Sequence, residues 1–352
     1  MKWIEPKYSK ERVKKAGNSL LKADLNCDEF TDAIPIFHNW RSSHAFPMQI
    51  MLDLLRKNSI KIDKNPLVVQ RLKRVQSIFK KIVREQNMSL SRMQDIAGCR
   101  AVLSDVKKVN KVCKSLVKSR TKNIFYKEYN YIESPKESGY RGIHLIYKYN
   151  GSKEKYIGML VELQIRSKIQ HSWATAVEVV GTFTNQALKA SSGDSEWLEL
   201  FKFISVEFAR LENCIVESRF KEVNTYEEMN KLINILELFE RLTAFKVATK
   251  TLTEKVEKKA GYFVLLLDIS DRVVIHTRFD KGKLDEATNY YNKLEIKHRD
   301  DVTKDVVLVS AASVRDLKTA YPNYFADTDE FVKNIKKVYS SYNYIFNKSL
   351  AS

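Results

Sequence analysis

The spacing of apolar residues changes several times along the chain and predicts both strands and helices. Short apolar or alternating runs are typical of strands, and in the first half they occur at 96–104 (IAGCRAVLS), 124–132 (IFYKEYNYI), 142–149 (GIHLIYKY) and 158–167 (GMLVELQIRS). Apolar residues three or four positions apart are typical of helices, and they occur at 47–57 (PMQIMLDLLRK), 71–86 (RLKRVQSIFKKIVREQ), 106–119 (VKKVNKVCKSLVKS) and about 168–180. This order of elements predicts an α/β (α+β) fold, in which a mixed sheet is flanked by helices.

The second half first becomes helical and then mixed. The segment FTNQALKASSG at 183–193 predicts a linker, and long helical patterns follow at about 194–219 and 225–257. Thr225 and Glu228 have the spacing of a capping box at the start of the second helix. Beyond residue 258 the pattern predicts strand, strand, helix, strand and helices. We therefore expect three parts, namely an α/β domain at 1–182, a helical connector at 183–257 and a small α+β domain at 258–352.

Composition narrows the class of protein. With 352 residues, 44% of them hydrophobic and 11% aromatic, the chain is long and apolar enough to bury a core. It has no run of roughly 18–20 apolar residues, and its start lacks the apolar run of a secretory signal. Its four cysteines are scattered without a CxxC pair, which predicts reduced thiols and no zinc site. We expect a cytoplasmic protein with no membrane partner.

The positive charge is confined to one half of the chain. The formal net charge is +18, and residues 1–182 hold 35 Lys or Arg against 17 Asp or Glu, whereas residues 183–352 hold 26 of each. A solvated basic surface explains such an excess without any function. The alternative is that the first half binds a polyanion such as a nucleotide or RNA.

Two segments offer groups suited to a triphosphate. One carries the regularly spaced cations and hydroxyl Arg71, Lys73, Ser77 and Lys81. In the other, Asp95 precedes a buried strand, where a carboxylate is well placed to bind Mg²⁺, and Arg100 lies inside the apolar run and needs an anionic partner. A solvated helix face and an Asp95–Arg100 salt bridge are the structural alternatives.

Two further segments concentrate polar groups where a strand or turn does not need them. Glu162, Gln164 and Arg166 alternate along one strand, so all three side chains point to one face. Burying these polar groups without partners would be costly, so this face of the strand is either exposed to solvent or part of a functional site. The loop ESPKESGYRGIH at 133–144 places four chemically active residues around two glycines: Lys136, Tyr140, Arg141 and His144.

Taken in order, RLKRVQSIFKK, RMQDIAGCRAV, ESPKESGYRGIHL and VELQIRSKIQHSWATAVE resemble the synthetase domain of RelA/SpoT proteins, across about residues 40–182. The resemblance implies a pyrophosphokinase that moves the β,γ-pyrophosphate of ATP to a ribose 3′-hydroxyl. It implies that Asp95 and Glu162 bind Mg²⁺ and that Glu162 serves as the base. The implied ATP-binding residues are Arg71, Lys73, Ser77, Lys81 and Arg100. The implied acceptor-binding residues are Lys136, Tyr140, whose ring stacks on the base, Arg141, His144, Gln164 and Arg166. Core packing remains the alternative for His144, and packing is favoured for Trp173.

The segments NWRSSHAFP at 39–47 and YPNYF at 321–325 resemble the CapRel-type branch of fused toxin–antitoxin proteins. That resemblance implies a toxic domain that modifies the 3′-CCA end of tRNA and a C-terminal domain that inhibits it until a phage protein acts as trigger. Tyr321 and Tyr324 fit the implied inhibitory Y-x-x-Y motif; Tyr339 and Tyr342 fit it equally as a string, and both pairs fit a core role.

Two other functions stay open at this stage. One is an alarmone synthetase that uses free guanine or adenine nucleotides as acceptors, and the other is a non-catalytic nucleic-acid-binding or sensor module. The presence together of Asp95, Glu162, Arg100 and Tyr140 favours an enzyme over the binding module.

Overall fold

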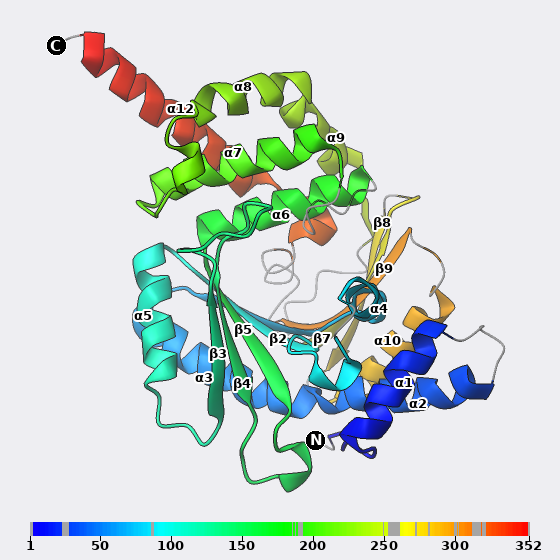
Figure 1. The fold of residues 1–352 in the computed structure, drawn as a ribbon. Coiled ribbons are helices and arrows are strands. Elements are labelled where there is room, and N and C mark those ends of the chain that lie inside the picture. The colour runs from blue at the N-terminus through cyan, green and yellow to red at the C-terminus, as the bar shows by residue number, and fades with distance from the viewer. Residues whose placement is uncertain are drawn as a thin grey trace.

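Strands from both halves of the chain join in one mixed sheet in the computed structural model of this protein (Figure 1). Among the described residues, the nine strands lie in the order β3-β4-β5-β2-β1-β9-β7-β8-β6. The pairs β2–β5 and β6–β8 are parallel, and the other neighbours are antiparallel. The structure describes residues 3–22, 28–85, 88–184, 193–248, 250–252, 261–271, 273–280, 282–298, 303–311 and 322–350, and the single residues 186, 188, 301 and 318.

The bounds of the elements agree with most of the strands and helices expected from the sequence. The strands are β1 (Leu67–Leu72), β2 (Ala97–Leu103), β3 (Ile124–Asn130), β4 (Ile143–Lys148), β5 (Leu160–Ser167), β6 (Lys250–Leu252), β7 (Gly261–Asp268), β8 (Val273–Asp280) and β9 (Lys304–Ala311). The helices are α1 (Lys10–Lys22), α2 (Asp28–Ser43), α3 (Ala45–Ile62), α4 (Val75–Arg84), α5 (Val106–Val117), α6 (Lys168–Phe183), α7 (Ser195–Leu211), α8 (Thr225–Ile235), α9 (Leu238–Ala248), α10 (Leu284–Lys297) and α12 (Asp329–Leu350).

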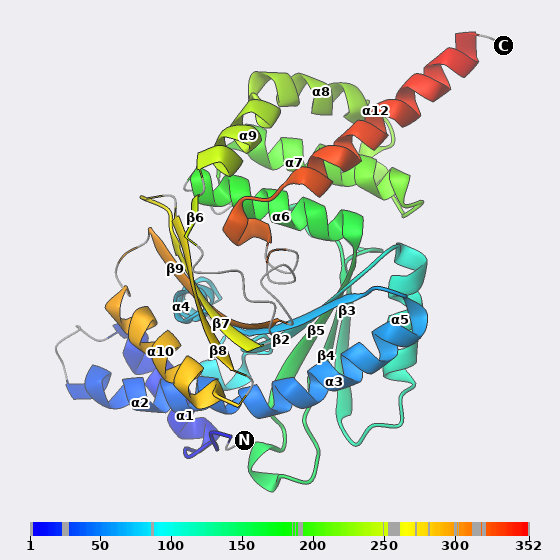
Figure 2. The ribbon, with the colours of Figure 1, turned by 180° about the vertical axis from the view of Figure 1, so that it is seen from behind.

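Helices cover the back of the sheet, and a second helical layer lies beyond one edge of its front (Figure 2). On the back, α3 and α5 bury apolar residues against β2, β4 and β5, and α10 does the same against β7 and β9. Beyond the front, α6 to α9 and α12 share a separate core built around Trp173, Phe201 and Phe331. No helix within the described parts of the chain is long and apolar enough to cross a membrane.

Two helical predictions need correction. The pattern at 71–86 is a strand followed by a helix, because Arg71 pairs with Gly98 in the sheet and α4 begins only at Val75. The pattern at 225–257 breaks after α8, where Glu237 adopts a left-handed backbone with φ of 48°. The expected capping box is also displaced, since the side chain of Asn224, not Thr225, accepts the backbone N–H of Glu227.

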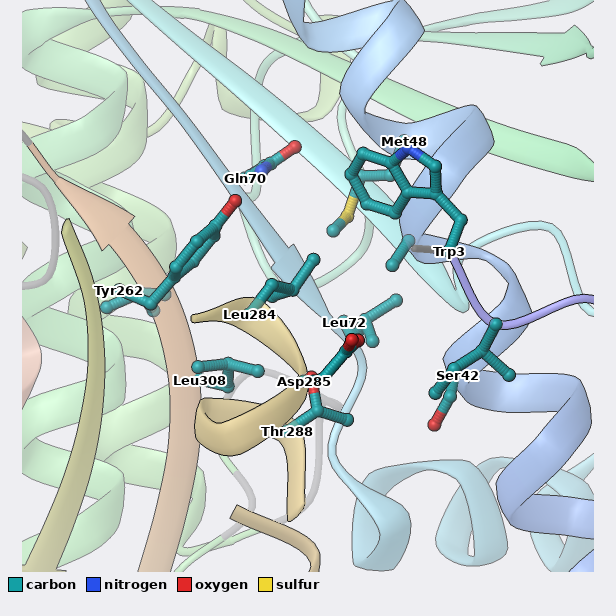
Figure 3. Close-up of a pocket in the computed structure, with 13 residues that line it drawn as sticks. Trp3, Ser42, Met48, Gln70, Leu72, Tyr262, Leu284, Asp285, Thr288 and Leu308 are labelled. Atoms are coloured by element: carbon teal, nitrogen blue, oxygen red, sulfur yellow. The ribbon is translucent and has the colours of Figure 1, made fainter. Parts of the chain in front are cut away.

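The C-terminal strands do not form a sheet of their own. Strand β9 pairs with β1, where Arg71 lies opposite Val309, so the expected α/β and α+β parts share one sheet. The last helix, α12, packs on α6 and α7 instead of on those strands, with Phe331 and Ile335 in the shared core. The three-part division of the chain remains a prediction. At the seam behind the sheet, Figure 3 shows a pocket where Trp3, Ser42 and Met48 face Leu284, Asp285 and Thr288 of α10.

Candidate active site

The front face of the central strands collects the charged residues that the sequence singled out. Register places Glu162 beside Gly98, and Gln164 lies between Arg100 on β2 and His144 on β4. Because side chains alternate along a strand, Glu162, Gln164 and Arg166 all project to this face, as predicted. Arg71 and Arg100 line one pocket there, together with Gly98 and Gln164.

Asp95 lies at the entrance to β2 and is held by two lysines. The Nζ of Lys73 lies 2.8 Å from one carboxylate oxygen of Asp95, and the Nζ of Lys81 lies 3.1 Å from the other. All three side chains are about four-fifths buried, since each exposes 18–20% of its surface. Ser77 precedes Lys81 by one helical turn on α4. Of the predicted phosphate-binding residues, Lys73 and Lys81 therefore contact the predicted metal ligand directly.

Burial and crowding of cations lower the pKa of Lys73. Burial is the larger cause; the charge of Asp95 opposes it, and the charges of Arg71 and Lys81 add to it. The pKa of Lys136 is lowered in the same way, by burial and then by Lys81 and Arg166, although Glu162 opposes the shift. These electrostatic interactions link the β1–α4 segment to the loop at 133–144 within one positively charged site.

Glu162 is fixed by a chain of hydrogen bonds. The Nδ1 of His144 lies 2.8 Å from one oxygen of Glu162, and the amide of Gln164 donates to the other at 2.6 Å. Because an ionised carboxylate only accepts, Nδ1 of His144 carries the proton, and Nε2 accepts from the hydroxyl of Tyr140 at 2.6 Å. The chain continues through Arg166, which donates to Gln164 at 2.9 Å.

The protonation of this pair follows from its surroundings. Burial lowers the pKa of His144, so its imidazole is neutral at pH 7 despite the nearby carboxylate. Burial alone acts to raise the pKa of Glu162. The electrostatic interaction with His144 and its hydrogen bond, the hydrogen bond from Gln164 and the charge of Lys73 together outweigh it. The pKa of Glu162 consequently lies below its ordinary value, and the group is an ionised carboxylate ready to accept a proton.

The loop at 133–144 is packed more deeply than the sequence suggested. Tyr140 exposes only 4% of its surface, with the guanidinium of Arg166 4.8 Å from its ring centroid and Trp173 beside it. The predicted stacking of an acceptor base on Tyr140 stays a prediction. In this structure the side chains of Arg166 and Trp173 pack against the Tyr140 ring. Tyr131, for which the sequence predicted no role, has the more accessible ring. The centroids of the Tyr131 and His144 rings lie 5.2 Å apart.

Arg141, which was predicted to bind substrate, is buried behind the loop in this structure, and its substrate-binding role stays a prediction. Its Nη1 donates to the carbonyls of Ile132 and Ile215, both at 3.0 Å, and 4% of its surface is exposed. The turn that directs it inward depends on Gly139, whose φ of 87° suits glycine and whose carbonyl accepts from Ser205 of α7 at 2.5 Å. Arg141 therefore anchors the loop to the helical layer. Trp173 has the packing role favoured for it, since its Nε1 donates to the carbonyl of Phe201 at 2.9 Å.

A buried carboxylate behind this loop gives a prediction about stability. Burial raises the pKa of Glu212 to about 7 from an ordinary 4.5, although the amide of Gln170 donates to it at 3.1 Å. Glu212 therefore contributes stability that is fully present below pH 4.5 and is lost as the pH rises through 7. Glu212→Gln is expected to remove this loss, with a gain in unfolding free energy above pH 7 of at most about 3 kcal/mol.

Urea unfolding of the two proteins at pH 6 and pH 9 measures this gain. Glu222→Gln, at an exposed position nearby, is the matched control and should follow the wild type. The assignment is wrong if Glu212→Gln and the wild type lose the same stability between the two pH values.

Tyr324 and Tyr342, one from each candidate inhibitory motif, pack in different clusters. Tyr321 lies outside the described residues. Tyr324, in the short 3₁₀ helix Pro322–Phe325, is 1% exposed and packs in a cluster with Val69 of β1 and Phe263 of β7. The alternative residue Tyr342 instead stacks on Tyr226 of α8 at 3.8 Å. Only Tyr324 of the two adjoins the strand that carries Arg71.

Comparison with known proteins agrees with the sequence motifs. Residues 70–183 match a family model described as "Region found in RelA / SpoT proteins". The chain is 36% identical over 120 residues to "GTP pyrophosphokinase YjbM" of Bacillus subtilis (strain 168), covering 32% of this chain and 56% of that protein. It is 26% identical over 192 residues to "Probable GTP diphosphokinase CRSH, chloroplastic" of Arabidopsis thaliana, covering 49% of this chain and 32% of that protein. The matches thus span about half or less of these relatives.

Among solved structures, the small alarmone synthetase 1 from Bacillus subtilis bound to its product pppGpp is 29% identical, with a TM-score of 0.37. That match covers 42% of this chain and 74% of the other. An additional structure of small alarmone synthetase 1 from the same species is 22% identical with a TM-score of 0.40, and the match covers 60% of this chain and 99% of the other.

Proposed function

We propose that this chain, a RelA/SpoT-domain protein by its match over residues 70–183, is an ATP-dependent pyrophosphokinase whose acceptor is the 3′-CCA end of tRNA. The proposal rests on one observation above the others. Asp95 with its two lysines, and Glu162 with its hydrogen-bonded histidine, face the same cation-rich side of one sheet. A charged triphosphate and a hydroxyl nucleophile need these two kinds of group close together.

The transfer assigns each group a role. Glu162 accepts the proton of the ribose 3′-hydroxyl as the oxygen attacks the β-phosphorus of ATP. The bond between that phosphorus and the oxygen bridging to the α-phosphate breaks, and AMP leaves. Arg71, Lys73, Lys81 and Arg100 neutralise the phosphate charge during the step. His144 and Gln164 keep Glu162 oriented.

The carboxylates fit a magnesium ion that is shared with the substrate. Among the described residues, no three His, Cys, Asp or Glu side chains group into a metal site. Mg²⁺ commonly takes one or two carboxylates and completes its shell with substrate phosphates and water, which suits Asp95 and Glu162. When bound with ATP, the ion would neutralise charge on the β- and γ-phosphates.

The charge distribution favours tRNA as acceptor over a free nucleotide. All of the net charge of +18 lies in residues 1–182, which hold the candidate site. A nucleotide needs only a small pocket, whereas tRNA also meets a wider basic surface. The alternative acceptors are GDP, GTP or adenine nucleotides, and the similarity to a GTP pyrophosphokinase favours that alarmone activity.

A labelled-acceptor assay separates these activities. The purified full-length chain is incubated with ATP labelled at the γ-phosphate, in parallel with deacylated tRNA, with tRNA lacking its terminal adenosine, and with GDP or GTP. We expect label on intact tRNA and none on the shortened tRNA. The same assay is run on the variant Glu295→Gln, Asp305→Asn, in which the C-terminal segment loses two contacts with the start of α4. Label confined to free nucleotides would establish the alarmone alternative, and an absence of label from every acceptor with both proteins would leave the binding-module hypothesis.

We place the C-terminal segment in the role of a built-in inhibitor, as expected for the CapRel-type branch, in a cytoplasmic anti-phage system. The geometry supports contact between this segment and the start of α4. Asp305 of β9 forms an ion pair with Arg74, and a carboxylate oxygen of Glu295 accepts the backbone N–H of Val75 at 3.2 Å. A phage protein that binds the C-terminal segment and breaks these contacts would serve as the trigger.

A third contact, made from behind the sheet, reaches the chain that connects β1 to α4. The Nε of the buried Arg41 donates to the carbonyl of Lys73 at 2.7 Å, and its Nη2 donates to the hydroxyl of Tyr291 on α10 at 2.6 Å. Lys73, Arg74 and Val75 are therefore each tied, directly or through Arg41, to the C-terminal segment. Movement of α10 and β9 would shift the residues that hold Asp95.

A further inference from the structure

Three tyrosines line the front of the edge strand β3, and each has a lysine ammonium over its ring. Lys148 lies 3.8 Å from the ring centroid of Tyr126, and Lys127 lies 4.5 Å from that of Tyr129. The third ring, Tyr131, has the ammonium of Lys136 at 4.5 Å. We call these six side chains the β3 ladder.

The ladder leads directly into the candidate active site. The rings of Tyr129 and Tyr131 are stacked, with centroids 6.0 Å apart and an interplanar angle of 7°. Tyr131 lies edge-on to His144 at 5.2 Å, and His144 holds Glu162. The hydroxyl of Tyr129 donates to Gln94, the neighbour of Asp95, at 3.2 Å. The ladder therefore adjoins both carboxylates.

Half of the ladder is exposed to solvent, and the other half is partly buried. Tyr126 exposes 49% of its surface, and Lys127 and Lys136 are exposed as well. Strand β3 ends the sheet, so nothing among the described strands pairs with its outer edge. Exposed Lys118, Arg120 and Lys122 precede the strand and extend the positive charge away from the site. Aromatic rings alternating with cations form the surface on which single-stranded nucleic acid binds, since bases stack on rings and phosphates pair with ammonium groups.

We infer that the β3 ladder binds the single-stranded 3′ tail of the acceptor RNA, with the terminal nucleotide at Tyr131 and earlier nucleotides towards Tyr126. The inference rests on the proposed RNA acceptor and names the surface that distinguishes RNA from a free nucleotide. One nucleotide fills the site beside Tyr131, whereas only a longer chain reaches Tyr126. Each lysine lies over a ring in this structure and would exchange that ring for a phosphate when a base stacks.

Binding of a labelled RNA tests the ladder independently of catalysis. The probe is a 5′-fluorescein 12-nucleotide single-stranded RNA ending in CCA, measured by fluorescence anisotropy with the full-length chain. Tyr126→Ala and Tyr131→Ala are each expected to weaken binding by about 5-fold to 100-fold, the loss of one stacked base. Tyr126→Phe and Tyr131→Phe retain the ring and should bind as the wild type does, which also shows that the hydroxyl is not the cause.

Charge and nucleotide length supply two further readouts. The double variant Lys127→Gln, Lys148→Gln should reduce the slope of log K against log salt by about 1.4, the value for two phosphates on a single strand. Tyr126→Ala should leave GDP binding unchanged. Tyr290→Ala and Lys293→Gln, at exposed positions on α10, are the matched controls.

The outcomes separate the inference from the proposed function. Wild-type affinity for RNA in both Ala variants overturns the ladder, even if tRNA is labelled in the transfer assay; this is also the result expected if the edge strand pairs with a protein strand instead. Failure of the wild type to bind the RNA, or failure of both the wild type and the Glu295→Gln, Asp305→Asn variant to label tRNA, overturns the RNA acceptor itself, and the ladder with it.

Discussion

Glu162→Gln is expected to lower the rate of pyrophosphate transfer by about 10³-fold, because the amide cannot accept the proton of the 3′-hydroxyl. The substitution nearly preserves shape, since the new side chain can still accept from Nδ1 of His144. Asp95→Asn is expected to cause a loss of similar size, because it removes the carboxylate that faces Lys73 and Lys81. Initial rates with γ-labelled ATP measure both effects.

The pH dependence of the wild type sharpens this prediction. The pKa of Glu162 lies below its ordinary value of 4.5, so the base stays ionised as the pH falls from 8 to 5, and its protonation should not limit the rate in that range. A rate that falls with a midpoint between pH 6 and 7 would contradict this assignment. Glu154→Gln, at an exposed position, is the control and should keep the wild-type rate.

Neutralising two C-terminal carboxylates is expected to activate the enzyme. In the double variant Glu295→Gln, Asp305→Asn, the start of α4 loses the charged partners of Val75 and Arg74. In this structure Lys73 and Lys81 both bind Asp95, and releasing α4 would free them to meet phosphate groups. We expect transfer to rise by roughly 10-fold, the effect of about two weakened hydrogen bonds.

Initial rates and growth inhibition on expression both measure this activation. Glu286→Gln on α10, whose carboxylate pairs with Lys283 on the surface, is the matched control and should not change the rate. A double variant that is stably folded and no more active than the wild type would contradict the inhibitory role. Point variants are preferable to truncation near residue 260, because truncation would expose the core that Val69 shares with Phe263 and Tyr324.

Much of the site was predictable because it depends on local spacing. Alternation along a strand is enough to place Glu162, Gln164 and Arg166 on one face, and the structure confirms it. The position of Asp95 at the entrance to a buried strand was likewise predictable. Its ion-pair partners were not, because the sequence suggested Arg100 and the structure gives Lys73 and Lys81. The burial of Arg141 was not predictable, because the direction of its side chain depends on the turn at Gly139 and on contact with α7.

The sequence by itself determined most of the strands and helices, the charge imbalance and most of the polar residues that meet around Asp95 and Glu162. These are properties of periodicity and composition, which each segment carries on its own. Only the tertiary structure decided that β9 pairs with β1, that Tyr140 is buried, and that Tyr131 is the accessible ring. Pairing between strands uses backbone hydrogen bonds that nearly all residues can make, and the burial of a side chain depends on elements distant in the chain. Neither property can therefore be predicted from a local sequence pattern.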